Sequence, residues 1–152
     1  MKSKILLYVG SIVIILWGVS HIVPTKSVVA GFGSITDENQ LIITMEWVAE
    51  GLTLCFIGIL VLYVTLRAGS GTPVSVIVYR ASALMLLVMA VWTGLTGART
   101  SIIPIKICPI VKTVVAILFI LGSSLLSRQG RKDRFSPKGG LSYPVSTTVG
   151  SP

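Results

Sequence analysis

The sequence predicts an all-α protein that crosses a membrane as a four-helix bundle. Its 152 residues are 53% hydrophobic and only 12% charged, which excludes a water-soluble globular domain of ordinary composition. The apolar residues gather in four runs separated by turn-forming or polar residues, and each run is long enough to cross the apolar core of a bilayer, which is about 30 Å thick. We expect one domain, residues 1–126, with spanning helices at about 5–23, 41–66, 76–97 and 109–126.

The first run, 5–23, follows a short basic start and ends at Pro24. It is longer than the apolar segment of a typical signal peptide, so we expect an uncleaved spanning helix. Helical spacing places small residues, Trp17 and the only histidine, His21, on one face of this helix. The small residues at 25–33 predict a loop.

The second helix has a clear start signal at 34–38, where hydroxyl side chains precede two acids. A helix from there to Leu66 is about 45 Å long at 1.5 Å per residue, which exceeds the apolar core of a bilayer. We therefore expect its first turns to stand outside the membrane, with Glu46 and Glu50 at or just below the interface. A second stripe on this helix consists of small residues and suits close helix packing: Gly51, Cys55 and Gly58.

The third and fourth helices follow a tight Gly- and Pro-containing turn at 67–73. One face of the third is predicted to point into the bundle: Ser82, Met85, Met89, Trp92, Thr93 and Thr96. An irregular connection then leads to Pro109, a natural first helical position. Residues 127–152 begin with basic residues and continue with Gly, Ser, Thr and Pro, which predicts a disordered tail whose basic beginning contacts anionic lipid headgroups.

The distribution of Lys and Arg predicts that both termini lie in the cytoplasm and that the protein resides in the cell membrane. With the N-terminus inside, nine of the thirteen basic residues face the cytoplasm. Four lie outside: Lys26, Arg99, Lys106 and Lys112. Because the basic residues flank apolar runs, the net charge of +8 indicates headgroup contacts rather than nucleic-acid binding. We expect the bilayer as the main partner and leave open a membrane protein partner or a second copy.

The predicted orientation collects the residues of greatest chemical interest in the outer half of the membrane. Glu46 and Glu50 are four residues apart and share a helix face, and an ionisable group at membrane depth is a functional-site hypothesis by default. The candidates for binding a ligand or proton are Glu50, Glu46, His21, Trp47 and Thr53. The candidate ion-pair partners of the acids are Arg99 and Lys112, with Lys106 as a further cation.

Three interpretations of these residues stay open. The acids and the cations could form a structural network, because buried charges are normally paired. They could instead form a binding or transport site in a small accessory membrane protein. The alternative is an intramembrane enzyme that uses Glu50, Glu46 and His21 as acid and base groups. We expect no metal and no cofactor, since the chain has neither a HExxH motif nor a second histidine, and we expect Cys55 and Cys108 to be free thiols.

One resemblance rests on the first two helices. The first helix ends Gly18-Val-Ser-His21, a glycine-containing loop follows, and the second helix opens on acids. With four helices in total, the chain resembles the small bacterial membrane proteins of the DoxX-like kind. The resemblance implies a bundle in the cytoplasmic membrane with an accessory role in redox chemistry or export, and it supplies no catalytic residues.

Overall fold

The computed structural model describes residues 2–67, 71–97 and 103–135 of the chain. Within these ranges the elements are α1 (Lys2–Ile22), α2 (Thr25–Ala30), α3 (Asp37–Arg67), α4 (Pro73–Thr96) and α5 (Ile103–Phe135), and no strand occurs among them. Four helices are long and apolar enough to cross a membrane, over Ser3–Ile22, Asp37–Arg67, Pro73–Thr96 and Ile103–Gln129. The prediction of an all-helical chain with four such helices is therefore confirmed.

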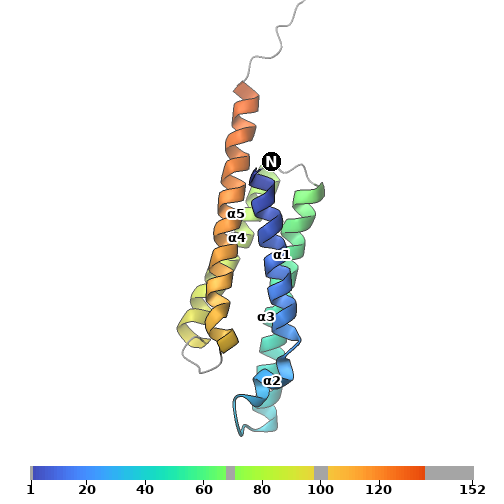
Figure 1. Ribbon diagram of the computed structural model, residues 1–152, viewed down its shortest axis with the longest axis vertical. Coiled ribbons are helices and arrows are strands. Elements are labelled where there is room, and N and C mark those ends of the chain that lie inside the picture. Colours follow the sequence, from blue (N-terminus) through green and yellow to red (C-terminus); the bar gives the residue numbers. More distant parts are fainter. Residues whose placement is uncertain (1, 68–70, 98–102, 136–152) are drawn as a thin grey trace, which may run out of the picture.

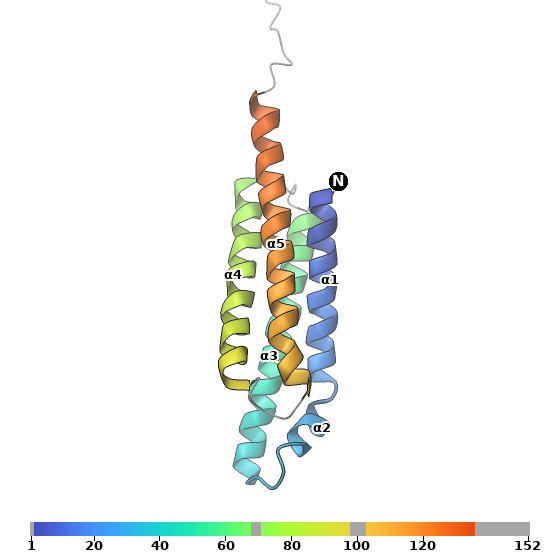
Figure 2. The same ribbon diagram turned by 60° about the vertical axis from the view of Figure 1, so that its left-hand side comes forward.

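The four long helices run along a common axis and pack in a specific order (Figure 1). α1 lies along α3, α4 lies along α5, and α1 also contacts α5, whereas α3 and α4 contact each other far less. The short helix α2 and the first turns of α3 extend beyond the ends of α4 and α5 (Figure 2). The seam between α3 and α4 is thus the least closed part of the bundle.

Both the interior and the exterior of the bundle are apolar. The core is formed by fully buried residues of all four long helices: Leu7, Ile14, Leu54, Val61, Tyr79, Leu86, Val115 and Phe119. On the outside, Leu16, Phe56 and Leu84 each expose more than 60% of their surface. A bundle surrounded by water would carry polar residues there, so this exterior suits a hydrocarbon environment.

The N-termini of α3 and α4 are capped by threonines. The Thr36 hydroxyl accepts a hydrogen bond from the Asn39 backbone N–H at 3.3 Å, as the start signal at 34–38 predicts. The Thr72 hydroxyl accepts one from the Ser75 N–H at 3.2 Å, and Pro73 occupies the first turn, where no backbone donor is needed. α4 therefore begins three residues earlier than the apolar run suggested.

Three predictions about the secondary structure are wrong. The segment expected as a loop contains α2, whose Val28 packs against Trp47 and Ile105; burial of these apolar side chains stabilises a helix that its length alone would not. The last helix begins at Ile103 rather than Pro109 and continues to Phe135. Residues 127–135, expected in the tail, are helical, because Arg, Lys and Gln are good helix formers. Residues 136–152 lie outside the described ranges.

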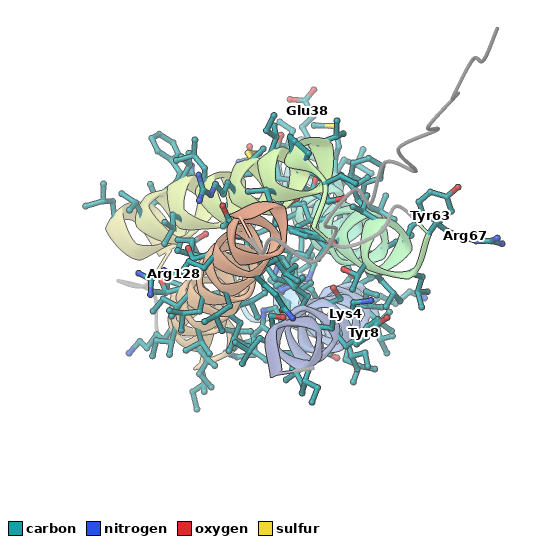
Figure 3. All side chains as sticks on the ribbon, turned by 90° about the horizontal axis from the view of Figure 1, so that it is seen from above. Lys4, Tyr8, Glu38, Tyr63, Arg67 and Arg128 are labelled. Carbon is teal, nitrogen blue, oxygen red and sulfur yellow. The ribbon has the colours of Figure 1, made fainter. Side chains whose placement is uncertain are left out.

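The two ends of the bundle carry different charges. Viewed from above, Lys4, Arg67 and Arg128 project from α1, α3 and α5 at the end where α3 finishes (Figure 3). The acids Asp37 and Glu38 stand at the opposite end, in the first turn of α3. Because successive long helices run in opposite directions, basic residues that are distant in the sequence lie at the same end of the bundle.

Helices α1 and α3 approach each other closely along the predicted small-residue stripe. A Cβ atom on Gly18 would lie 2.7 Å from the Gly51 carbonyl oxygen, and a Cβ on Gly51 would lie 3.0 Å from the Gly18 carbonyl oxygen. The Cys55 thiol contacts the Ile15 carbonyl oxygen at 3.6 Å on the same face. This backbone contact leaves no room for side chains and brings His21 alongside the turn of α3 that carries Trp47 and Glu50.

Replacing Gly18 by Ala is expected to lower the free energy of unfolding by about 1–3 kcal/mol, the usual cost of an overpacked contact. The matched control is Gly94→Ala, because a Cβ on Gly94 of α4 would meet nothing within 4 Å. Thermal unfolding of both variants in a neutral detergent provides the measurement. A Gly18→Ala midpoint equal to that of Gly94→Ala would contradict the close approach.

Candidate functional site

Glu50 lies at the centre of a polar cluster to which four helices contribute. Its Oε1 accepts a hydrogen bond from Lys112 Nζ and lies 3.5 Å from the Thr93 hydroxyl and 3.7 Å from the Cys108 sulfur. Its Oε2 lies 3.5 Å from His21 Nε2. We call these five residues the Glu50 cluster. One side chain of α3 is thereby connected to α1, α4 and α5.

Lys112 closes the cluster from the side of α5. Its side chain is fully buried, and its Nζ donates to Thr93 Oγ1 at 2.7 Å as well as to Glu50. A buried ammonium group is costly unless its donors find acceptors. Here the carboxylate supplies the opposite charge and the threonine a second acceptor, so the structure brings together Glu50 and one of its two candidate ion-pair partners. The other candidate, Arg99, lies outside the described residues.

His21 is held against Glu50 by Trp47. The two rings stack with centroids 3.8 Å apart and planes 11° from parallel, and the Trp47 indole N–H donates to the His21 carbonyl oxygen. His21 is only 3% exposed, and its Nε2 makes no hydrogen bond with any residue that the structure describes. The distance between His21 Nε2 and Glu50 Oε2 is 3.5 Å, which is too long for a good hydrogen bond.

Thr93 and Cys108 belong to the cluster although they were not among the predicted site residues. Cys108 precedes Lys112 by one helical turn and so shares its face; its sulfur also accepts a hydrogen bond from the Trp17 indole N–H at 3.3 Å. Thr93 lies on the α4 face predicted to point inward, but Met85 and Trp92 of that face are exposed. Helical spacing could therefore have identified both residues. Thr93 lies on the α4 face that was predicted to point inward, and Cys108 lies four residues before the candidate Lys112. Both cysteines are free, as expected.

A cavity of about 630 Å³ opens beside the cluster, in the seam between α3 and α4. Its lining includes four of the predicted site residues, Glu46, Trp47, Glu50 and Thr53. The Glu50 side chain is 25% exposed, so the carboxylate is anchored on its inner side and open on the other. His21 does not line the cavity, and Glu46 lines it without joining the Glu50 cluster. The remaining lining residues come mainly from α3 and α4: Ile42, Ile43, Ala49, Val88, Met89, Trp92, Thr93, Thr96, Gly97 and Ile105.

The cluster also contains atoms of the kinds that bind metals. One ligand atom each from His21, Glu50 and Cys108 lies within 4.8 Å of the others, and this donor set is suited to zinc. However, the Lys112 ammonium group already contacts the Glu50 carboxylate. A metal ion at this carboxylate would face a neighbouring positive charge, so Lys112 would have to move or lose its proton first. In this structure the Glu50 carboxylate is instead neutralised by the ammonium group of Lys112.

In comparisons with known proteins, no family model, no curated protein and no solved structure matches this chain.

Glu50→Gln is expected to lower the free energy of unfolding by about 3–5 kcal/mol, because it leaves the buried Lys112 ammonium without its counter-charge. Glu46→Gln, the matched control one turn away on the same helix, should have no measurable effect, since Glu46 is exposed. Denaturant unfolding of the purified variants in neutral detergent measures both. The double variant Glu50→Gln/Lys112→Met should regain most of the loss, because neither residue then leaves a buried charge. A Glu50→Gln variant as stable as the wild type would show that the pair does not support the fold.

Proposed function

We propose that this protein is a multi-pass integral membrane protein that binds a small molecule in the cavity between α3 and α4, with Glu50 as the central polar contact. The observation that carries the proposal is the asymmetry of Glu50. Its inner side is held by Lys112 and faces His21, while a quarter of its side chain remains exposed beside the cavity. We expect the protein to act as a small binding or accessory module.

A purely structural ion pair would favour a sealed environment, since water exclusion strengthens the attraction between charges. The Glu50 cluster instead lies beside a cavity whose volume falls within the range of about 300–1,000 Å³ typical of small-molecule sites. The lining combines apolar and aromatic side chains with a few polar groups, as such sites usually do. These features support a binding role in addition to the stabilising role of the pair.

The position of the cavity supports entry of the ligand from the bilayer. The lining residues Ile42, Val88 and Trp92 are each more than half exposed and belong to α3 and α4, which contact each other far less than α1 and α3 or α4 and α5 do. A ligand with an apolar body can therefore leave the lipid phase sideways without first crossing water. This route favours a molecule that already partitions into membranes.

We further propose that both termini are cytoplasmic, in a cell membrane. The basic end marked by Lys4, Arg67 and Arg128 then lies inside (Figure 3), in agreement with the excess of positive charge on cytoplasmic flanks. The acidic start of α3 and the Glu50 cluster fall in the outer half of the membrane.

Binding is better supported than the alternative of intramembrane acid–base catalysis. A proton donor or acceptor must come within hydrogen-bond reach of the reacting group. His21 is almost fully buried behind Trp47 and is absent from the cavity lining. Glu50 Oε1 is already occupied by Lys112. The geometry thus favours a fixed carboxylate over a proton-transfer pair.

The orientation predicts that a cysteine introduced as Ser34→Cys is labelled by a membrane-impermeant maleimide on intact cells, because residue 34 precedes α3 at the outer end. Gln129→Cys, near the inner end of α5, should be labelled only after permeabilisation. The wild-type chain measures the background from Cys55 and Cys108. The reverse pattern would invert the orientation.

The binding proposal predicts that 1-aminoanthracene, a fluorescent probe of apolar cavities, binds the purified protein in neutral detergent and loses at least about tenfold in affinity for Ala49→Phe. Ala49 is exposed and lines the cavity, so the larger ring should occupy the site without disturbing the core. Ala81→Phe, at an exposed position of α4 outside the lining, is the control and should bind like the wild type. Equal fluorescence with both variants and the wild type would overturn the proposed function, since the signal would then come from the detergent alone.

A further inference from the structure

We infer that the ligand of the cavity between α3 and α4 is an amphiphilic amine, with a protonated ammonium head and an apolar body. This inference rests on the proposed function and names the chemical class of the ligand. It follows from the charges that line the cavity, from the hydrogen-bonding capacity that remains unused there, and from the shape of the lining.

The charge of the lining is negative. Glu46 and Glu50 are its only ionisable residues; no Lys, Arg or His is among the described residues that line the cavity. Lys112 neutralises Glu50 from behind but is fully buried and does not reach the cavity. Glu46 has no ion pair with any residue in the described part of the chain. A ligand in this cavity therefore meets one carboxylate, that of Glu46, which no cation of the described residues balances.

The hydrogen-bond donors of the lining are largely used. Each threonine hydroxyl donates to the carbonyl oxygen four residues earlier at 2.8 Å: Thr53 to Ala49, Thr93 to Met89 and Thr96 to Trp92. The Trp47 indole N–H is likewise bound, to the His21 carbonyl oxygen. Among the described lining side chains this leaves only the Trp92 indole, which is 69% exposed. Hydroxyl lone pairs and the carboxylates remain as acceptors, so the cavity requires a ligand that brings its own donors.

An ammonium head satisfies both requirements at once. It offers several N–H donors and a positive charge, and hydrogen bonds between charged partners are roughly twice as strong as neutral ones. The lining also includes Trp47 and Trp92, and indole rings attract organic cations. An alcohol head would leave Glu46 without a counter-charge, and a carboxylate head would be repelled by it.

The apolar part of the lining argues against a bare inorganic cation. Calcium and magnesium ions bind six or more oxygen ligands. Much of the surface of this cavity is instead formed by apolar side chains: Ile42, Val88, Met89 and Ile105. These side chains suit a hydrocarbon body of several carbons. The polar and apolar parts of the cavity thus match the two parts of one amphiphilic molecule.

The test measures displacement of 1-aminoanthracene from the wild-type protein at pH 7 by three probes of equal chain length: octylammonium, 1-octanol and octanoate. We expect octylammonium to act at concentrations at least about tenfold lower than 1-octanol, with octanoate the weakest. Glu46→Gln should reduce the advantage of octylammonium over 1-octanol to less than about threefold. Glu38→Gln, which removes an exposed acid of α3 outside the cavity lining, should leave the advantage unchanged.

The possible results separate this inference from the function on which it rests. If 1-octanol displaces the probe as well as octylammonium does, the ammonium head is wrong while the binding cavity stands. If Glu46→Gln keeps the full preference, the preference does not come from the unbalanced carboxylate and the inference is likewise overturned. If the probe binds Ala49→Phe as well as the wild type, the binding function itself fails and the inference fails with it.

Discussion

The contact between Glu50 and Lys112 is the constraint on which the rest of the bundle depends. Either charge alone inside an apolar bundle would cost several kcal/mol, so the helices that carry them, α3 and α5, must be arranged to bring the two groups together. Thr93 supplies a second acceptor from α4, and His21 faces the other carboxylate oxygen from α1. The pair thus specifies how the four long helices are placed around one point, in addition to the non-directional packing of the apolar core.

Glu50 has the closely packed helices α1 and α3 on one side and the cavity on the other. The contact of Gly18 with Gly51 allows α1 and α3 to meet backbone to backbone, which brings His21 and Trp47 together on the inner side of the carboxylate. No comparable small-residue contact draws α3 and α4 together, and the cavity lies between these helices beside Glu46 and Glu50. The cavity therefore lies beside the ion pair of Glu50 and Lys112.

Trp47 lies between His21 and the cavity. Its ring covers His21, its indole N–H is bound to the His21 carbonyl oxygen, and it packs with Val28 of α2 and Ile105 of α5. It also lines the cavity. This arrangement keeps the histidine out of the cavity while leaving Glu50 in its lining.

The sequence by itself determined the helical class, the four long apolar segments and the helix start at 34–38, because hydropathy, spacing and capping are local properties of the chain. It also singled out Glu50 as an ionisable residue within an apolar segment. It also limited the cationic partners of Glu50 to a few residues, one of which, Lys112, the structure brings to it. Only the tertiary structure decided that Glu46 stays outside the cluster, that His21 is covered by Trp47, and that Thr93 and Cys108 join. Helical periodicity tells which residues share a face of one helix, but not which helix lies opposite that face. The cavity between α3 and α4 arises from the relative placement of two helices, which no local pattern encodes.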